Sequence, residues 1–198
     1  MQCGNSGGKR TLKRIEEFGS LIEITGFRGA RIDDFREFLR SIINRKSTDV
    51  EVQFFDSRTV ATWEHLYFAA LNALTSFSNK TNISKTLPME TLLYAATERQ
   101  IIKATKKMGI KQTTSDVAVL IFGKDTKNIE STISLISKML KAKPEDEVLG
   151  LSESKCKLIR KLFSISGTEL GSVMKGIDAN RGLVELVIER IALVSSRR

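Results

Sequence analysis

The sequence predicts an α+β fold, in which a small mixed β-sheet of about four strands is packed with helices in a single domain. Three observations favour this class. Strand-like and helical segments alternate in the first half of the chain, and helices dominate the second half. The 198 residues suit one hydrophobic core. A hydrophobic content of 41% is ordinary for a globular protein.

The N-terminal segment is rich in Gly, Lys and Arg. Residues 1–14 show no periodicity, so we expect residues 1–18 to form a basic flexible arm before a domain of residues 19–198. The apolar and β-branched segment Ser20–Arg28 then suits a first strand.

A first helix is expected after this strand. Asp33 and Asp34 lie where a helix start favours negative charge. Apolar residues follow at helical spacing (Phe35, Phe38, Leu39, Ile42 and Ile43). Asp49–Phe55 alternates in its first half as a half-buried strand does.

The strongest helical pattern of the chain lies in Thr59–Phe77. Its continuous apolar face contains Val60, Trp63, Tyr67, Ala70, Leu71, Leu74 and Phe77. A turn, Ser78–Leu87, interrupts this pattern, and Pro88 suits the first turn of a helix over Met89–Thr97. We expect that helix to continue into, or bend before, a basic helix that ends near Gly109.

The second half of the chain contains the predicted central strand. Ser115–Lys124 is apolar on both faces, and Asp125 can cap a helix with Ile at three regularly spaced positions. Glu147–Leu151 is predicted as a short final strand. Two helices close the chain, around Lys155–Phe163 and Leu183–Val194. Residues 166–182 between them form a Gly-rich loop, insertion or frayed helix.

The charge of the chain favours an acidic partner. Lys and Arg number 32 against 23 Asp and Glu, which gives a formal net charge of +9. Such a surface suits nucleic acid or an acidic protein. On a helical projection Arg99, Lys103, Lys106 and Lys107 fall within about one third of the circumference. This stripe can hold a polyanion, but an ordinary solvated helix has the same pattern.

Side chains for catalysis are sparse. His65 is the single histidine and lies in an apolar helical segment, so a structural role is expected. With two cysteines and one histidine, the sequence indicates no metal site and no cofactor. The longest wholly apolar run, Val117–Phe122, is far too short to cross a membrane. We therefore expect a cytoplasmic binding protein and not an enzyme.

Several segments together resemble one family. They are Gly26–Ile32, the helix around Trp63–Leu66, Asn82–Ile101, Asp116–Gly123 and the closing Glu189–Val194. In order and spacing they are similar to the kinase-binding accessory subunit of the KEOPS (EKC) complex, the PRPK-binding protein family. The resemblance covers roughly residues 20–165 and 184–195.

The resemblance implies a non-catalytic subunit with two partners. Members dock on the N-terminal lobe of the small atypical kinase/ATPase subunit and contact the remaining KEOPS subunits indirectly. They also capture the single-stranded 3′ CCA end of tRNA. The complex adds a threonylcarbamoyl group to adenosine 37 (t6A), and that chemistry belongs to another subunit.

For the RNA we expect contacts from two neighbouring segments. Asn82, Lys85, Arg99 and Gln100 are the predicted acceptor-end site, with Lys80 and Lys103 as flanking phosphate contacts. Arg99 offers a fork of donors, and the two amides can read base edges. In the alternative interpretation Asn82 only builds the turn and Arg99 pairs with Glu98 or Glu90.

For the kinase we expect the end of the chain to form the docking surface. The C-terminal run has more apolar side chains than one helix face needs, and we assign Ile188, Ile191, Leu193 and Val194 to kinase binding. The alternative is that these residues pack inside the protein.

Two other functions compete with this prediction. The chain could be a free-standing basic RNA-binding protein without a kinase partner, which co-purification would distinguish. A small enzyme with buried carboxylates is disfavoured, because no acid–base pair stands at a readable spacing.

Overall fold

The computed structural model describes residues 11–15, 18–174 and 178–194. At its centre lies a four-stranded sheet with the order β1-β2-β4-β3, in which every neighbouring pair is antiparallel. The strands are β1 (Thr11–Ile15), β2 (Ser20–Phe27), β3 (Glu51–Asp56) and β4 (Val117–Gly123). The register places Leu21 opposite Gly123 and Glu51 opposite Phe122.

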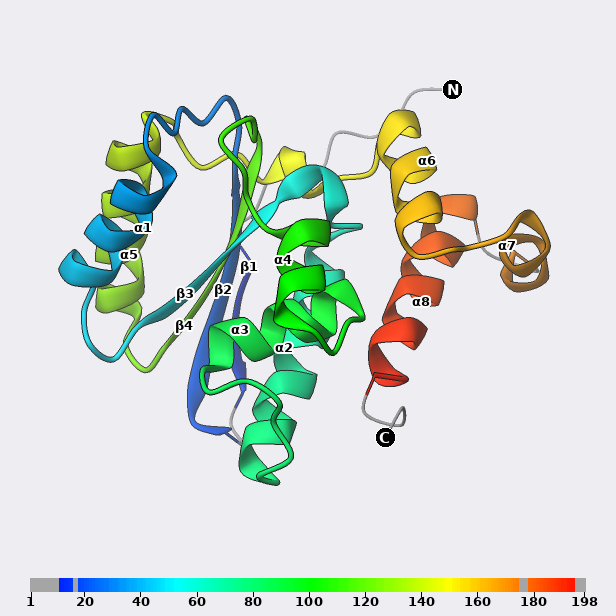
Figure 1. Cartoon of the computed structure of the whole chain (residues 1–198), viewed down its shortest axis with the longest axis horizontal. Coiled ribbons are helices and arrows are strands. Elements are labelled where there is room, and N and C mark those ends of the chain that lie inside the picture. Colours follow the sequence, from blue (N-terminus) through cyan, green and yellow to red (C-terminus); the bar gives the residue numbers. More distant parts are fainter. Residues whose placement is uncertain (1–10, 16–17, 175–177, 195–198) are drawn as a thin grey trace.

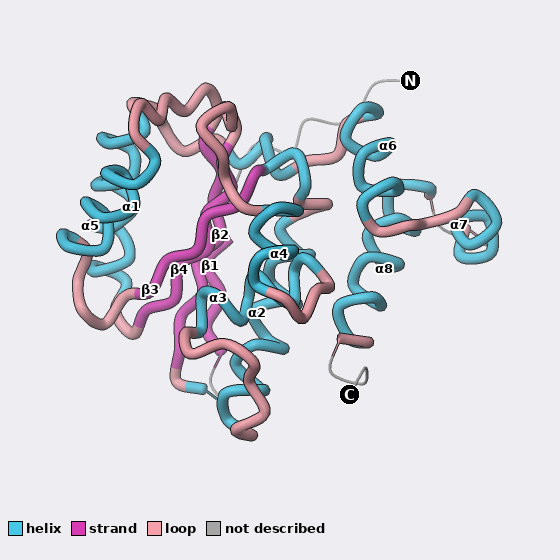
Figure 2. The backbone as a smooth tube through the Cα atoms, in the orientation of Figure 1, coloured by secondary structure: helices cyan, strands magenta, loops and turns pink. Residues whose placement is uncertain are grey.

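Helices cover both faces of the sheet (Figure 1). One face carries α1 (Phe35–Arg45) and α5 (Thr126–Leu140). The other carries α2 (Trp63–Ser78), α3 (Leu87–Ala96) and α4 (Ile101–Met108). Beyond them lie α6 (Glu153–Leu162), α7 (Gly167–Val173) and α8 (Ala179–Ala192), as Figure 2 also shows.

Strand β4 divides the core into two clusters. All seven of its residues are buried, because the strand has a neighbour on each side and helices over each face. Val117, Val119 and Ile121 contribute to the cluster under α1 and α5, whereas Ala118 and Leu120 contribute to the cluster under α2, α3 and α8. Successive side chains of a strand point to opposite faces, and both faces of β4 are buried. Every position of the strand is therefore apolar.

The predicted α+β class is confirmed, and so are three of its strands. β2, β3 and β4 lie within one or two residues of the predicted segments, and α1 begins after Asp34. The Asp34 carboxylate accepts hydrogen bonds from the amides of Arg36 and Glu37, at 2.8 and 2.9 Å.

Three details differ from the prediction. The sheet is antiparallel throughout and not mixed. Helix α2 begins at Trp63 instead of Thr59, because Ser57–Thr59 forms a 3-10 turn, η2. Helix α5 follows Asp125, whose side chain makes no capping bond.

Part of the predicted N-terminal arm is a strand. Thr11–Ile15 pairs with β2 and supplies the edge of the sheet, where the exposed Lys13 suits an edge strand. Lys13 lies 5.5 Å from the ring centroid of Trp63. The prediction of a disordered segment over residues 1–14 is therefore wrong for residues 11–14, and residues 1–10 lie outside the described residues.

The predicted strand Glu147–Leu151 is also wrong. A 3-10 helix, η3 (Asp146–Leu149), occupies this segment and crosses closely over β2 at Gly26. A Cβ at Gly26 would stand 2.2 Å from a Val148 methyl carbon, so only glycine permits this approach. The amide of Glu145 donates to the Gly26 carbonyl at 2.7 Å.

The Gly-rich segment 166–182 contains helix α7. The Ser166 hydroxyl accepts from the amide of Glu169 at 3.1 Å, and the Glu169 carboxylate accepts from the amide of Ser166 at 2.8 Å. This capping box starts a helix, although the glycine content of the segment favoured a loop. None of the helices in the described ranges is long and apolar enough to cross a membrane.

Candidate functional site

The residues predicted to bind RNA lie at the two ends of α3. Lys80, Asn82 and Lys85 belong to the turn before this helix, whereas Arg99, Gln100 and Lys103 follow it. Ten residues of helix separate the two groups by about 15 Å along the axis. The residues therefore form two patches, one at each end of α3, whose place in the fold is shown in Figure 1.

The first patch is built on a buried carboxylate. Glu90, in the first turn of α3, accepts hydrogen bonds from the amide of Ile83 at 3.0 Å and from the amide of Ser84 at 2.7 Å. The Asn82 side chain donates to the Ser84 carbonyl at 2.9 Å. Asn82 thus helps to build the turn, as the alternative interpretation stated. Lys80 and Lys85 are exposed beside it.

The second patch differs from the predicted basic stripe. The chain bends at Thr97, which has a φ of 54°, and α4 begins at Ile101, so Arg99 lies on the corner and not on the helix. Arg99, Gln100 and Lys103 are all exposed. Because the Glu90 carboxylate is bonded to the turn, the predicted alternative of an Arg99–Glu90 pair is disfavoured.

The side chain of Lys107 points inward, so this lysine is not part of an exposed basic stripe. Its ammonium donates to the Ala96 carbonyl at 2.7 Å, lies 4.4 Å from the ring centroid of Phe163 and is 3.9 Å from the Glu98 carboxylate. A cation at the carbonyl end of α3 also complements the helix dipole. This lysine therefore fixes the α3–α4 corner.

The single histidine reinforces the same corner. Nδ1 of His65 accepts from the amide of Ala61 at 3.1 Å, and Nε2 donates to the Ala95 carbonyl at 2.9 Å. Complete burial lowers the pKa of His65 to about 4, so the ring is neutral at physiological pH. His65 acts as a structural tie between α2 and α3, in agreement with the prediction.

The C-terminal helix presents less apolar surface than predicted. Ile191 is fully buried and Val194 is 2% exposed, so both belong to the core. Ile188 is half-buried against that core, and Leu193 is 44% exposed. The prediction that all four side chains offer a docking surface is therefore wrong for Ile191 and Val194.

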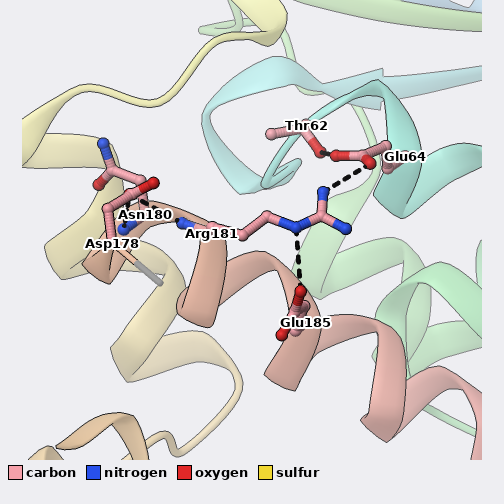
Figure 3. A network of polar contacts seen from close by, with 6 residues as sticks. All are labelled: Thr62, Glu64, Asp178, Asn180, Arg181 and Glu185. Carbon is pink, nitrogen blue, oxygen red and sulfur yellow. Dashed lines mark hydrogen bonds and ion pairs between the residues drawn. The ribbon is translucent and has the colours of Figure 1, made fainter. Parts of the chain in front are cut away.

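A charged clamp holds the start of α8 against the start of α2 (Figure 3). Arg181 donates to the Glu64 carboxylate at 2.8 Å and to the Glu185 carboxylate at 3.0 Å. Asp178 caps α8 through the amides of Asn180 and Arg181. From this clamp the two helices run side by side in the same direction (Figure 1).

Sequence reasoning missed one exposed side chain on the neighbouring helix. Phe68 is 36% exposed and lies one turn after Glu64, on the side of α2 that meets α8 at the clamp. Phe68 falls outside the apolar face predicted for this helix, and a large apolar residue in that position was the sequence feature that could have indicated its exposure. We use the name α2–α8 face for three apolar side chains of these two neighbouring helices that reach solvent, Phe68, Ile188 and Leu193.

No group of three or more His, Cys, Asp or Glu side chains that could hold a metal ion occurs in the described part of the chain.

Comparison with known proteins shows to which family the chain is similar. Residues 32–195 match a family described as kinase binding protein CGI-121. The chain is also similar to a protein of Methanocaldococcus jannaschii named regulatory protein Cgi121. The two are 32% identical over 175 residues, which cover 88% of this chain and 98% of the relative. The matched segment contains both patches of α3 and the α2–α8 face.

Proposed function

The chain belongs to the CGI-121 family of kinase-binding proteins, and from this premise we propose that it works as the accessory subunit of a KEOPS complex. Family membership makes it a regulatory protein that is not itself an enzyme. In the proposal it docks on the N-terminal lobe of the small kinase/ATPase subunit, captures the 3′ CCA end of tRNA and supports t6A formation in the cytoplasm. The family match over residues 32–195 is the observation that carries the proposal.

The kinase is proposed to bind the α2–α8 face. Phe68 and Leu193 are large apolar side chains in partial contact with solvent, and such groups favour burial against a partner. Ile188 would contact the kinase beside them, while Ile191 and Val194 would hold the helix from behind. A stable contact buries about 800 Å² on each partner, so charged residues such as Glu185 and Glu189 would lie at its rim.

A double substitution tests this surface. Phe68→Glu with Leu193→Glu should abolish co-elution with the kinase, because two buried charges would lack partners. Its melting temperature should stay within a few degrees of the wild type, since both side chains reach solvent. Ile43→Glu is the matched control, because Ile43 is 64% exposed on the opposite face of the sheet. Retention of the kinase by the double variant would refute the assignment.

The tRNA end is proposed to bind along α3. Lys80 and Lys85 at one end and Arg99 and Lys103 at the other would neutralise phosphates, while the amides of Asn82 and Gln100 contact bases. Two exposed patches about 15 Å apart can hold a single strand stretched along the helix. With about four phosphates neutralised, log affinity should fall against log salt with a slope of about −3.

Charge reversal tests the RNA surface. Lys85→Glu with Arg99→Glu should abolish binding of intact tRNA, whereas Arg36→Glu with Arg40→Glu, the same charge change on α1, should leave most of it. Wild-type protein should bind intact tRNA better than tRNA trimmed of its last three nucleotides. Equal binding of trimmed and intact tRNA would refute the proposed capture of the 3′ CCA end. A basic RNA-binding protein without a kinase partner would pass the tRNA test but would not retain the kinase.

A further inference from the structure

A cleft opens at the end of the sheet where β2 and β3 finish and β4 begins. It has a volume of about 470 Å³ and is bounded by η2, η3 and the first turns of α6. Sites for small molecules commonly have 300–1,000 Å³. The cleft shares no residue with the two patches of α3 or with the α2–α8 face, so neither the kinase nor the tRNA assignment accounts for it.

A buried lysine lines this cleft. Lys155 is 8% exposed, and its ammonium donates to the carbonyls of Val148 and Gly150, each at 3.0 Å. Both carbonyls belong to residues that line the cleft. An ammonium has three donors, and the third has no acceptor in the part of the chain that the structure describes. Burial lowers the pKa of Lys155 to about 8.

The other cations of the cleft are already neutralised. Arg58 donates to the Asp56 carboxylate at 2.7 Å, and Arg28 lies 2.6 Å from the Glu145 carboxylate. Among the described residues Lys155 has no such ion pair within 4 Å. Burial lowers the pKa of Lys155 and outweighs the charges of Asp116 and Asp56, which favour the protonated ammonium from beyond ion-pair distance. An anion placed beside the ammonium would therefore be stabilised.

The first turn of α6 presents further donors to the same space. Ser152 and Ser154 both line the cleft, and their hydroxyl oxygens are 3.2 Å apart. The Ser152 hydroxyl already caps the amide of Lys155 at 3.3 Å. The amides of Glu153 and Ser154 have no carbonyl partner within the helix, and such amides attract phosphate. Helix α6 has ten residues, which is long enough for this effect. The Lys155 side chain and the start of α6 therefore both border the cleft.

The remaining walls suit the rest of a larger ligand. Asp116 and Glu147 supply carboxylate acceptors, and Leu151 and Leu158 supply apolar surface. A phosphate alone would use neither of these. We propose that the cleft binds a nucleoside monophosphate, with the phosphate at Lys155 and the start of α6, the ribose hydroxyls on Asp116 and Glu147, and the base against the two leucines.

Calorimetric titration of the full chain with adenosine monophosphate, adenosine and inorganic phosphate tests this proposal. The nucleotide should bind at least tenfold more tightly than either fragment. Ser154→Asp should weaken nucleotide binding at least tenfold, because it places a carboxylate at the phosphate position. The variant should fold normally, since helix starts favour acidic residues. Thr168→Asp makes the same change at the second residue of α7 and should bind as the wild type does.

A second variant addresses the lysine. Lys155→Gln keeps a donor for one carbonyl but removes the charge, so it should also weaken nucleotide binding at least tenfold. Wild-type affinity should fall above pH 8, as the ammonium loses its proton. Absence of saturable binding at millimolar nucleotide would overturn the proposal. So would unchanged affinity in Ser154→Asp, or phosphate binding as tight as that of the nucleotide. None of these results depends on the kinase or on tRNA.

Discussion

The burial of Val194 gives opposite predictions for two adjacent residues at the end of α8. Val194 is 2% exposed within the core cluster, whereas Leu193 is 44% exposed on the α2–α8 face. Val194→Ala removes two buried methyl groups. At about 0.8 kcal/mol per buried carbon, this should lower the free energy of unfolding by about 1.5–2 kcal/mol. Leu193→Ala should cost less than about 0.5 kcal/mol, the usual effect of a surface change.

The expected effect is large enough to measure by thermal unfolding. For a chain of this size each kcal/mol shifts Tm by about 2–4 °C, so Val194→Ala should lower Tm by about 3–8 °C. Leu193→Ala should change Tm by less than about 2 °C. In a kinase pull-down at 10 °C the pattern should reverse, with Leu193→Ala the weaker binder. Equal shifts in Tm for the two variants would refute the burial argument.

The burial of Val194 also determines what truncation of the chain should do. If the closing run were only a docking surface, deleting the chain from Leu193 onward would weaken kinase binding with little loss of stability. Because the deletion removes the buried Val194, it should cost at least as much stability as Val194→Ala. Truncation is therefore a poor test of docking, and Leu193→Ala or Leu193→Glu is the better one.

Two further predictions concern buried polar groups. Glu90→Gln replaces a carboxylate that accepts from the amides of Ile83 and Ser84. It should lower stability by about 1–3 kcal/mol and weaken tRNA binding through the disordered turn, while kinase retention is unchanged. If Glu90→Gln kept the wild-type affinity for tRNA, the turn would not be part of the RNA-binding surface. The folded-state pKa of His65, about 4, lies below the ordinary value of 6.5, so its neutral form stabilises the fold above pH 6.5. About 3 kcal/mol of stability should be lost as the pH falls from 6.5 towards 4. His65→Asn should show a shallower loss over this range, and an equal loss would contradict the assignment.

The parts of the fold that were predicted correctly have strong periodicity and two-sided burial. β4 is apolar along its whole length because the sheet buries both of its faces, and β2 and β3 pair with it directly. β1 was missed because a basic edge strand forms through pairing with β2, which local composition does not encode. The η3 segment was misassigned because its course depends on Gly26, which is distant in sequence.

The candidate RNA site was predicted only as a set of segments. A helical projection treats every charged residue as solvated, yet Lys107 buries its stem and places its ammonium on the Ala96 carbonyl. The projection also assumed that the helix includes Arg99, whereas Thr97 adopts a left-handed conformation and turns the chain there. Both errors come from tertiary contacts at the end of α3, where local pattern and three-dimensional environment disagree.

The error in α8 is different, because the sequence contained the correct answer. Val184, Val187, Ile191 and Val194 follow one another at intervals of three, four and three residues, which is the spacing of a single helix face. All four are buried in the structure. Leu183 and Leu186 are also buried, so the large apolar side chains of the helix that remain are Ile188 and Leu193. Counting apolar residues in the closing run overestimated its exposed apolar surface, whereas assigning them to faces separates the core of the helix from the side chains that reach solvent.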